Sequence, residues 1–436
     1  MIRIALTFCF FLASLPAHAA SEIEEFTTPG GIEVWLVNEP SIPIVALEVS
    51  FKGGTSLDLP GKEGAVNLMT GLLEEGAGDL DATQFLEATE ELAASYSYRS
   101  FRDTVSIEAE MLKENVDEAI DLLRLALNEP NFEQKAFDRV KAQVTSSLSQ
   151  DKTDPDEIAS AKLRELSFPG HPYGTRDEGS LETVGALTRD DVITAHRNTL
   201  VTSRMYVGVV GDITADELGP LVDRLLGDLP ADGPPLPEPV EMAIGGGTTI
   251  IDLATPQSVA LFGHKGIARE DPDFFAAFLL NEILGGSGVE SRLMREVREK
   301  RGLTYGVYTY LAPFDHATQM MGSVASANDR IADAIKVIQD EWRLAAEMGI
   351  SEAELNDAKL YVTGAYPLRF DSNVKIAGIL VGLQLTGLPS DYIKTRNEKM
   401  LAVTLEEVNA MAKRLLQPDA LRFVVVGQPE GLTATD

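Results

Sequence analysis

The chain contains few of the residues from which thiol chemistry and metal sites are built. It has 436 residues but only one cysteine and five histidines. The cysteine, Cys9, lies in an apolar run near the N-terminus that we expect to be removed, which would leave the mature chain without a thiol. This excludes a disulfide framework, a thiolate zinc site and a cysteine nucleophile.

The histidines of the expected mature chain are too scattered to form a metal motif. His171, His196, His264 and His316 are far apart, and no two of them have the spacing that places two ligands on one helical face. A histidine metal site would therefore have to be assembled from distant segments. A lone histidine is more often a polar or partly buried side chain than a ligand.

Positive charge is also scarce. The chain has 37 Lys and Arg against 68 Asp and Glu, which gives a formal net charge of -31. Acidity of this extent argues against nucleic acid and anionic membrane surfaces as partners.

The N-terminus has the pattern of a secretory signal peptide. A cationic start at Arg3 precedes an apolar run over 4–15, and Ala17 and Ala19 form an A-x-A cleavage pattern. We expect residues 1–19 to be a signal peptide cleaved after Ala19, and the mature protein to be periplasmic or secreted. No other apolar stretch is long enough to cross a bilayer, so no membrane span is expected.

The sequence repeats itself with one offset, and its length suits two domains or more. Thr188–Val192 (TRDDV) corresponds to Thr404–Val408 (TLEEV), and the triplet VVG at 209–211 returns at 425–427, both 216 residues later. An amphipathic helix recurs 215 residues later, its apolar positions Val116, Ile120, Leu123 and Leu127 matching Ile331, Ile335, Ile338 and Trp342. These agreements indicate a tandem duplication.

The duplicated pattern predicts an α+β fold of two domains, each a mainly antiparallel sheet with helices on one face. The segment 229–240 carries five prolines and should be an extended linker between domains at 20–228 and 241–436. A cleft between two such halves is a common place for a binding site.

Local patterns give the expected elements. In the first half they predict strands over 32–36, 45–51 and 98–108, and helices over 64–73, 82–94 and 116–127. In the second half they predict a strand over 258–263 and a helix over 273–284.

The segment 285–311 combines a glycine turn, a helix and a strand. Ser287 and Glu290 form a capping box that predicts the start of a helix, Gly302 can end it, and alternation over 303–311 predicts a strand. Arg298 and Tyr305 then flank one reversal of the chain, where a guanidinium and a phenol could donate to a peptide carbonyl or an oxyanion. Spacing alone equally allows an arginine favoured by the helix dipole and an aromatic residue in a sheet.

Several of these features together resemble the pitrilysin/insulysin family, which includes the mitochondrial processing peptidase and its paired bacterial relatives. They are the duplicated halves, the helix within Gly64–Ala77, the stretch HPYG from His171, and SRLMREVREKRGLTY. The resemblance covers nearly the whole mature chain. It implies half of a clam-shell chamber in which a zinc peptidase cuts extended peptides. The family motif, H-x-x-E-H, supplies two zinc ligands and a general base, and a glutamate on a later helix is the third ligand.

The chain departs from that motif at each reactive position. Asn67 stands at the first histidine, Thr70 at the base and Gly71 at the second histidine. A carboxamide, a hydroxyl and a hydrogen atom do not replace imidazole or carboxylate ligands. The later helix, around 134–149, contains no glutamate. We therefore expect no metal site in this chain and no cofactor of its own.

The resemblance also assigns residues to the substrate. Arg298 and Tyr305 match an arginine and a tyrosine that contact the substrate backbone at the scissile bond. Gly285, Gly286 and Gly288 match a glycine-rich loop that touches substrate, although a plain helix-entry turn explains them equally well.

The resemblance thus implies a non-metal-binding subunit of an exported heteromeric zinc peptidase. Its partner would be a homologous subunit that carries H-x-x-E-H and the zinc, and its substrate an extended peptide. One alternative is a catalytically inactive peptide-binding or scaffold protein with the same fold. Another is a self-sufficient peptidase with unorthodox ligands, which would hold stoichiometric zinc when purified alone.

Overall fold

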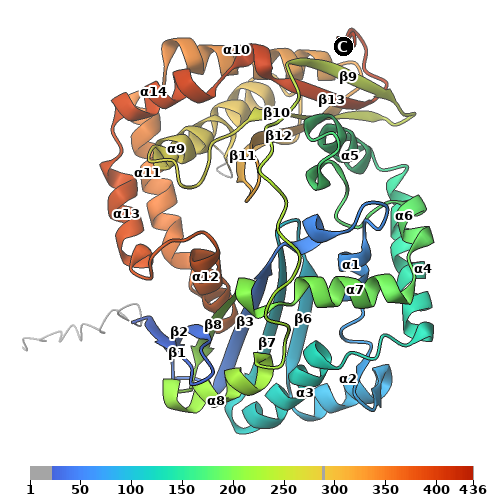
Figure 1. The fold of residues 1–436 in the computed structure, drawn as a ribbon. Coiled ribbons are helices and arrows are strands. Elements are labelled where there is room, and N and C mark those ends of the chain that lie inside the picture. Colours follow the sequence, from blue (N-terminus) through green and yellow to red (C-terminus); the bar gives the residue numbers. More distant parts are fainter. Residues whose placement is uncertain (1–21, 287–289, 436) are drawn as a thin grey trace, which may run out of the picture.

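The structure, a computed structural model, describes residues 22–286 and 290–435. The expected signal peptide lies outside these residues. The chain forms two sheets whose helical layers face away from each other, one in the lower half and one in the upper half of Figure 1. No helix of the described part is long and apolar enough to span a membrane.

The first sheet has the order β1-β2-β8-β3-β7-β6. Its strands are β1 (Glu24–Thr27), β2 (Glu33–Asn38), β3 (Ile44–Lys52), β6 (Ser95–Ser100), β7 (Thr104–Leu112) and β8 (Met205–Gly211). The helices of this half are α1 (Ala65–Thr70), α2 (Ala82–Glu91), α3 (Val116–Asn128), α4 (Gln134–Asp151), α5 (Pro155–Ser167), α6 (Leu181–Ala186), α7 (Arg189–Thr199) and α8 (Ala215–Leu226), and a small ribbon is formed by β4 (Gly76–Ala77) and β5 (Leu80–Asp81).

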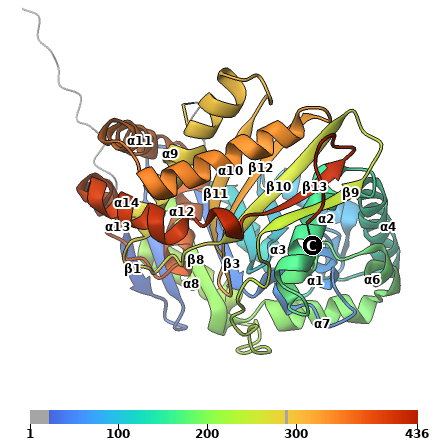
Figure 2. The ribbon, with the colours of Figure 1, turned by 90° about the horizontal axis from the view of Figure 1, so that it is seen from above.

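The second sheet has the order β11-β12-β10-β13-β9. Its strands are β9 (Gly247–Asp252), β10 (Gln257–Lys265), β11 (Val307–Pro313), β12 (Thr318–Ala327) and β13 (Arg422–Gly427). Its helices are α9 (Phe274–Gly285), α10 (Ile331–Met348), α11 (Glu352–Ala365), α12 (Asn373–Leu385), α13 (Tyr392–Ala402) and α14 (Leu405–Leu415). Seen from above, α10 runs across the outer face of this sheet (Figure 2).

The two sheets repeat one topology. The series β2-β8-β3-β7-β6 corresponds, element by element, to β9-β13-β10-β12-β11. In both, the pairing is antiparallel except for one parallel pair in the same place, β2 with β8 and β9 with β13. The expected fold class, two duplicated α+β halves with mainly antiparallel sheets, is confirmed.

Each sheet buries its outer face under helices of its own half. The alternate residues of β3 that point to this side, Val45, Leu47, Val49 and Phe51, are at most 2% exposed. In the second half Trp342 of α10 is 1% exposed and packs against Phe262 of β10. These two apolar cores are the main source of stability.

Each half also lends one helix to the inner face of the other sheet. Ala159 and Leu163 of α5 pack against Val424 and Val426 of β13. In the opposite direction, α12 packs its apolar side on β8, where a Cβ at Gly208 would lie 2.8 Å from the carbonyl oxygen of Ala377. This exchange adds a layer that the sequence patterns did not predict, and it joins the two halves through apolar contacts.

A buried polar contact joins the halves at a second place. Tyr173 is fully buried, and its hydroxyl donates to Asp103 Oδ1 over 2.5 Å and accepts from the backbone N–H of His316 over 3.0 Å. Nearby, Lys52 pairs with Asp315 at 3.3 Å. The segment 229–240 between the halves contains no helix or strand.

Two expected elements of the first half differ from the structure. The predicted strand over 98–108 is a hairpin, in which β6 and β7 are joined by a turn at 101–103. The turn is held in place because its three carbonyl oxygens accept from the segment after β3: Asp103 from Gly53 N–H over 2.6 Å, and Phe101 and Arg102 from Thr55 and Ser56 N–H over 2.9 Å each. The helix predicted over 64–73 is only six residues long, α1, since a series of turns replaces it after Thr70.

Candidate functional site

The helix at the motif position begins with a cap supplied from outside it. Asp58 accepts hydrogen bonds from the backbone N–H groups of Gly64 (2.7 Å) and Val66 (2.9 Å). Gly64 has φ of 95°, a conformation that favours glycine. Burial raises the pKa of Asp58 to about 7, although the two backbone bonds favour the ionised form.

All three degenerate motif positions of this helix serve the fold. Asn67 donates from Nδ2 to Ser100 Oγ on β6 over 3.2 Å. Thr70 is 2% exposed and donates to the carbonyl oxygen of Val66 over 2.8 Å. At Gly71 an added Cβ would lie 3.4 Å from Val140 Cγ1 on α4. The helix therefore packs as an ordinary structural element.

These residues do not fit a zinc ion. Their donors are one carboxamide, one hydroxyl already bonded to a carbonyl, and no side chain at Gly71, whereas catalytic zinc takes imidazole or carboxylate ligands. The facing helix α4 reads QKAFDRVKAQVTSSLSQD and offers no glutamate. Among residues 22–286 and 290–435, no group of three or more His, Cys, Asp or Glu side chains is arranged to hold a metal ion.

The same arrangement exists in the second half. Asn281 and Gly285 on α9 have the spacing of Asn67 and Gly71, and both lie 214 positions later. Asn281 Oδ1 accepts from Thr309 Oγ1 over 2.9 Å, on β11, the counterpart of β6. The sequence analysis did not match Asn281 and Gly285 to Asn67 and Gly71, although the pattern N-x-x-x-G occurs in both helices and could have shown the match. Both helices of the pair thus use asparagine to bond an edge strand.

Two predictions before Arg298 fall on residues 287–289, which lie outside the described residues. They are Ser287 of the expected capping box and Gly288 of the expected glycine loop. The first described turn is instead capped by Ser291. Its carbonyl oxygen accepts from Arg295 N–H over 3.0 Å, and its hydroxyl from Met294 N–H over 3.4 Å.

The helix that carries Arg298 is wound as a π-helix over Met294–Glu299. The N–H of Lys300 donates over 3.0 Å to the carbonyl oxygen of Arg295, five residues earlier, which is the bonding pattern of a π-helix. Gly302 ends the helix with φ of 60°, as expected, and its N–H donates to the carbonyl oxygen of Arg298 over 2.8 Å. Single π turns occur frequently at functional sites, where they change the direction of one side chain.

The strand predicted from Leu303 begins four residues later, at Val307. The hydroxyl of Thr304 donates to the carbonyl oxygens of Gly306 (2.8 Å) and Ala325 (2.6 Å), so this segment forms a side-chain-stabilised bend in place of ladder bonds. Tyr305 therefore lies on a bend between helix and strand, and not in the sheet. The expected alternation holds from Val307 onward, where Val307 and Thr309 are buried and Tyr308 and Tyr310 are exposed.

Arg298 and Tyr305 lie on opposite sides of the reversal with their side chains in solvent. Arg298 is exposed, and Tyr305 is 89% exposed. Neither side chain bonds to, or stacks on, any other residue that the structure describes, and the two do not contact each other. The structure thus places both groups on one short segment, with none of their side-chain donors bonded to a described residue.

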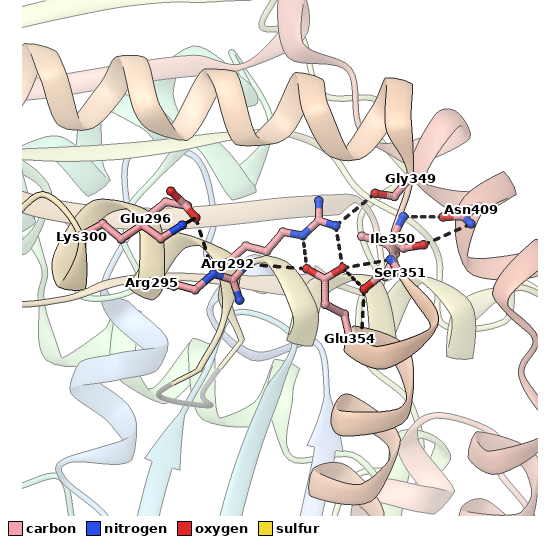
Figure 3. Close-up of polar contacts among 9 residues, drawn as sticks. All are labelled: Arg292, Arg295, Glu296, Lys300, Gly349, Ile350, Ser351, Glu354 and Asn409. Atoms are coloured by element: carbon pink, nitrogen blue, oxygen red, sulfur yellow. Dashed lines mark hydrogen bonds and ion pairs between the residues drawn. The ribbon is translucent and has the colours of Figure 1, made fainter.

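An ion-pair network fixes the helix of Arg298 to α11 (Figure 3). Arg292 donates from Nε to Glu354 Oε1 over 2.5 Å and from Nη2 to Glu354 Oε2 over 2.8 Å, and it also reaches the carbonyl oxygen of Gly349 over 3.1 Å. Ser351 N–H donates to the same carboxylate over 2.9 Å. Burial opposes ionisation of Glu354, but the bonds from Arg292 and Ser351 lower its pKa to about 2. Sequence spacing could not show this pair, because its partners are 62 residues apart.

The described glycines of the expected loop are required by packing. A Cβ at Gly285 would lie 2.7 Å from Thr309 Oγ1, and one at Gly286 would lie 2.5 Å from the carboxyl group of Glu282. Gly285 is the last residue of α9. These contacts account for both glycines at the end of a helix, and contact with substrate stays a prediction.

Fold and site together define a class: an internally duplicated protein with a peptidase-like motif helix that lacks zinc ligands. Comparison with known proteins agrees. Residues 33–176 match the family description "Insulinase (Peptidase family M16)", and residues 186–361 match "Peptidase M16 inactive domain". The chain is therefore built of M16 insulinase-family domains.

Three relatives describe the similarity further. The chain is 27% identical to the "Non-peptidase homolog YmxG" of Helicobacter pylori, over 88% of this chain and 89% of that protein. It is 23% identical to an "uncharacterized zinc protease" of Streptomyces coelicolor, over 92% of this chain and 88% of that one. The crystal structure of a peptidase M16 inactive domain from Pseudomonas fluorescens superposes with a TM-score of 0.88 at 26% identity, covering 95% of this chain and 99% of that one.

Proposed function

We propose that this chain is the non-metal-binding subunit of an exported, heteromeric zinc metallopeptidase of the pitrilysin type. Its partner is a homologous subunit that carries H-x-x-E-H and holds the zinc. The chain contributes half of a peptide chamber, together with Arg298 and Tyr305, which donate to the substrate in trans. On its own it does not cleave peptides.

One contrast carries this proposal. The motif positions Asn67 and Thr70 have their polar groups bonded within the fold, whereas Arg298 and Tyr305 have none bonded to the described residues. An arginine on a π-helix that a partly buried ion-pair network holds in place, and whose own donors bond no described residue, suits an external acceptor better than a structural role.

The chemistry of the pair follows from its donors. The Arg298 guanidinium presents several N–H groups, and the Tyr305 phenol presents one O–H. Both can donate to the carbonyl oxygen of a bound peptide bond, and these bonds strengthen as negative charge develops on that oxygen. The pair therefore orients the peptide and stabilises the oxyanion, and the partner supplies everything that requires the metal.

The similarity to proteins named as inactive M16 domains and as a non-peptidase homolog supports the loss of independent activity. Export rests on the N-terminal pattern of residues 1–19, and the partner on the need for a complete motif elsewhere. The glycines at 285, 286 and 288 are proposed to line the path of the substrate beside the pair.

The competing function is a peptide-binding or scaffold protein that retains the chamber without any turnover. The exposed donors of Arg298 and Tyr305 would support this function if they bind a peptide without stabilising an oxyanion. An adjacent reading frame of similar length that encodes H-x-x-E-H supports the subunit, while an isolated gene supports the scaffold.

The test uses the reconstituted complex of this chain with its zinc-bearing partner and a quenched fluorescent peptide. Arg298→Ala and Tyr305→Phe should each lower kcat by about 10²–10³. Since both side chains are exposed, the melting temperature and assembly should be unchanged. Arg343→Ala, an exposed arginine on α10, is the matched control. Unchanged cleavage in both variants would remove the assigned roles.

A further inference from the structure

A small cavity of about 160 Å³ lies where α5 of the first half meets the inner face of the second sheet. On the side of the second sheet it is lined by residues of β10, β11 and β12. The polar residues that line it are Arg102, Ser160, Arg164, Tyr308, Tyr310, Gln319 and Ser323. The remainder of the lining is mostly apolar.

The charge of this cavity is opposite to that of the protein. Two arginines line it, and none of the described residues in its lining is acidic, in a chain whose net charge is -31. Guanidinium, phenol, hydroxyl and amide groups together offer hydrogen-bond donors, and the one carboxylate paired with them, Asp177 on Arg102, lies outside the lining. A cavity with this lining is suited to an anion.

Arg102 is held in place by aromatic rings. Its guanidinium lies 5.1 Å from the ring centre of Tyr173 and 5.0 Å from that of Phe314. Its nearest carboxylate, Asp177, is 3.6 Å from Nε, and the Arg102 side chain is only 10% exposed. The cation–π contacts fix the guanidinium and leave donors for a ligand.

Arg164 has no ion-pair partner among the described residues. Nη2 donates to Ser160 Oγ over 3.0 Å, but Nε is buried with no acceptor, and no carboxylate of the described chain lies within ion-pair distance. Burial lowers the pKa of Arg164, and the charge of Arg102 lowers it further, while the more distant carboxylates of Asp177 and Glu178 oppose that change. A bound anion would offset both the burial and the charge of Arg102.

Two tyrosines complete the cavity on the side of β11. The rings of Tyr308 and Tyr310 stack with centres 6.4 Å apart. Burial raises the pKa of Tyr310, while the charges of Arg164 and Arg102 oppose that change, which places the phenol within their field. Tyr305, one of the two proposed oxyanion donors, lies on the bend that leads into this strand.

We propose that this cavity is a carboxylate-binding subsite of the peptide chamber, and that it gives the enzyme a preference for peptides with an acidic group at a fixed distance from the scissile bond. The inference rests on the proposed function for its biological use, but binding of the carboxylate by this chain is independent of the partner. The carboxylate is either the side chain of an Asp or Glu residue or the free C-terminus of the peptide.

The experiment measures binding of labelled peptides to the full mature chain alone, by fluorescence anisotropy at low salt. Matched peptides carry Glu or Gln at successive positions, and each is made with a free or an amidated C-terminus. We expect at least one Glu peptide, or the free C-terminus, to bind about tenfold more tightly than its neutral match, as one charge-assisted contact implies. Which of the two arms shows the effect identifies the source of the carboxylate.

Variants of the chain locate the effect. Arg164→Gln and, separately, Tyr310→Phe should reduce the preference for the acidic peptide, and Arg343→Gln, an equal charge change on the outer helix α10, should not. Arg164 lies on α5, which joins the two halves, so the melting curve of the Arg164→Gln variant is recorded together with its peptide binding. Tyr310→Phe removes only a hydroxyl and provides a second test if Arg164→Gln unfolds.

The outcomes separate this inference from the proposed function. Selectivity for the carboxylate that is lost in Arg164→Gln or Tyr310→Phe supports the subsite, even if the complex with the partner shows no turnover. Equal binding of acidic and neutral peptides in every arm overturns it, and so does an equal loss in Arg343→Gln, whatever the complex cleaves.

Discussion

Asn67 and Ser100 are joined by a hydrogen bond of 3.2 Å, and Asn281 and Thr309 make the corresponding contact in the second half. Asn67 donates its bond and Asn281 accepts, but in both halves the asparagine joins the motif helix to the edge strand of its sheet. The position that the sequence resemblance assigned to a lost zinc ligand, Asn67, attaches a helix to an edge strand.

Restoring the motif should not restore a zinc site. In the variant with Asn67→His, Thr70→Glu and Gly71→His, the third ligand is still missing from α4. Thr70 is 2% exposed, so a glutamate there buries a carboxylate at a cost of about 3 kcal/mol or more. Metal analysis after dialysis should give well under one zinc per chain, and the melting temperature should fall. One tightly bound zinc in a stable variant would contradict this account of the helix.

Glu354 should position the helix of Arg298 without touching substrate. Its carboxylate accepts two bonds from Arg292 and also pairs with Arg295 at 3.7 Å, so Glu354→Gln removes two ion pairs between these elements. In the complex we expect kcat to fall and the free energy of unfolding to decrease by about 1–3 kcal/mol. Lys300→Gln, which breaks an exposed pair with Glu296 on the same helix, is the control and should change neither quantity measurably.

The same residue predicts an acid-dependent loss of stability. The native pKa of Glu354 is about 2 and its ordinary value is 4.5, so the stabilisation is complete above pH 4.5 and is lost as the pH falls toward 2. Denaturant unfolding at pH 6 and pH 3 should show a smaller difference between wild type and Glu354→Gln at the lower pH. An equal difference in unfolding free energy at pH 6 and pH 3 would show that the charge of Glu354 does not contribute to stability.

Glu48 should have the opposite effect. It is 8% exposed on the inner face of the first sheet, and burial raises its pKa to about 7, with Ser106 favouring and Glu108 opposing the ionised form. Because the native pKa lies above the ordinary value of 4.5, the folded state loses stability as the pH rises from about 4.5 to 7. Glu48→Gln should therefore stabilise the protein at pH 8, by up to about 3 kcal/mol, and have little effect near pH 4.

The exchanged helices predict that the two halves remain together after the linker is cut. A protease site inserted within 229–240, where no helix or strand is broken, should give two fragments that co-elute in size-exclusion chromatography. They are held by α5 on β13 and by α12 on β8. Leu380→Asp, at a buried position of α12, should separate them after cutting. Fragments that part without that substitution would contradict the assigned interface.

Periodicity and the internal repeat were sufficient to predict the fold class from the sequence. The two VVG triplets, 216 residues apart, lie in β8 and β13, which are the two copies of one strand. Each takes the same place in its sheet, as a duplication predicts. The boundaries around Tyr305 could not be predicted, because a threonine hydroxyl replaces the ladder bonds there. The packing of α5 and α12 on the sheet of the opposite half could not be predicted either, because the apolar residues of a helix do not indicate which sheet they cover.

Of the proposed site, the sequence predicted the loss of the zinc ligands at Asn67, Thr70 and Gly71 and a role for the segment of Arg298, and both stay predictions. It could not identify Arg292 with Glu354, or the cavity of Arg102 and Arg164, because tertiary structure alone brings those partners together. Such contacts leave no periodic pattern.

The most direct test of the central claim is zinc content and peptide cleavage, measured on this chain alone, on its partner alone and on the two together. We predict no stoichiometric zinc and no cleavage for this chain alone, and cleavage by the mixture that depends on Arg298 and Tyr305. Full zinc occupancy with hydrolysis by the isolated chain would contradict the account.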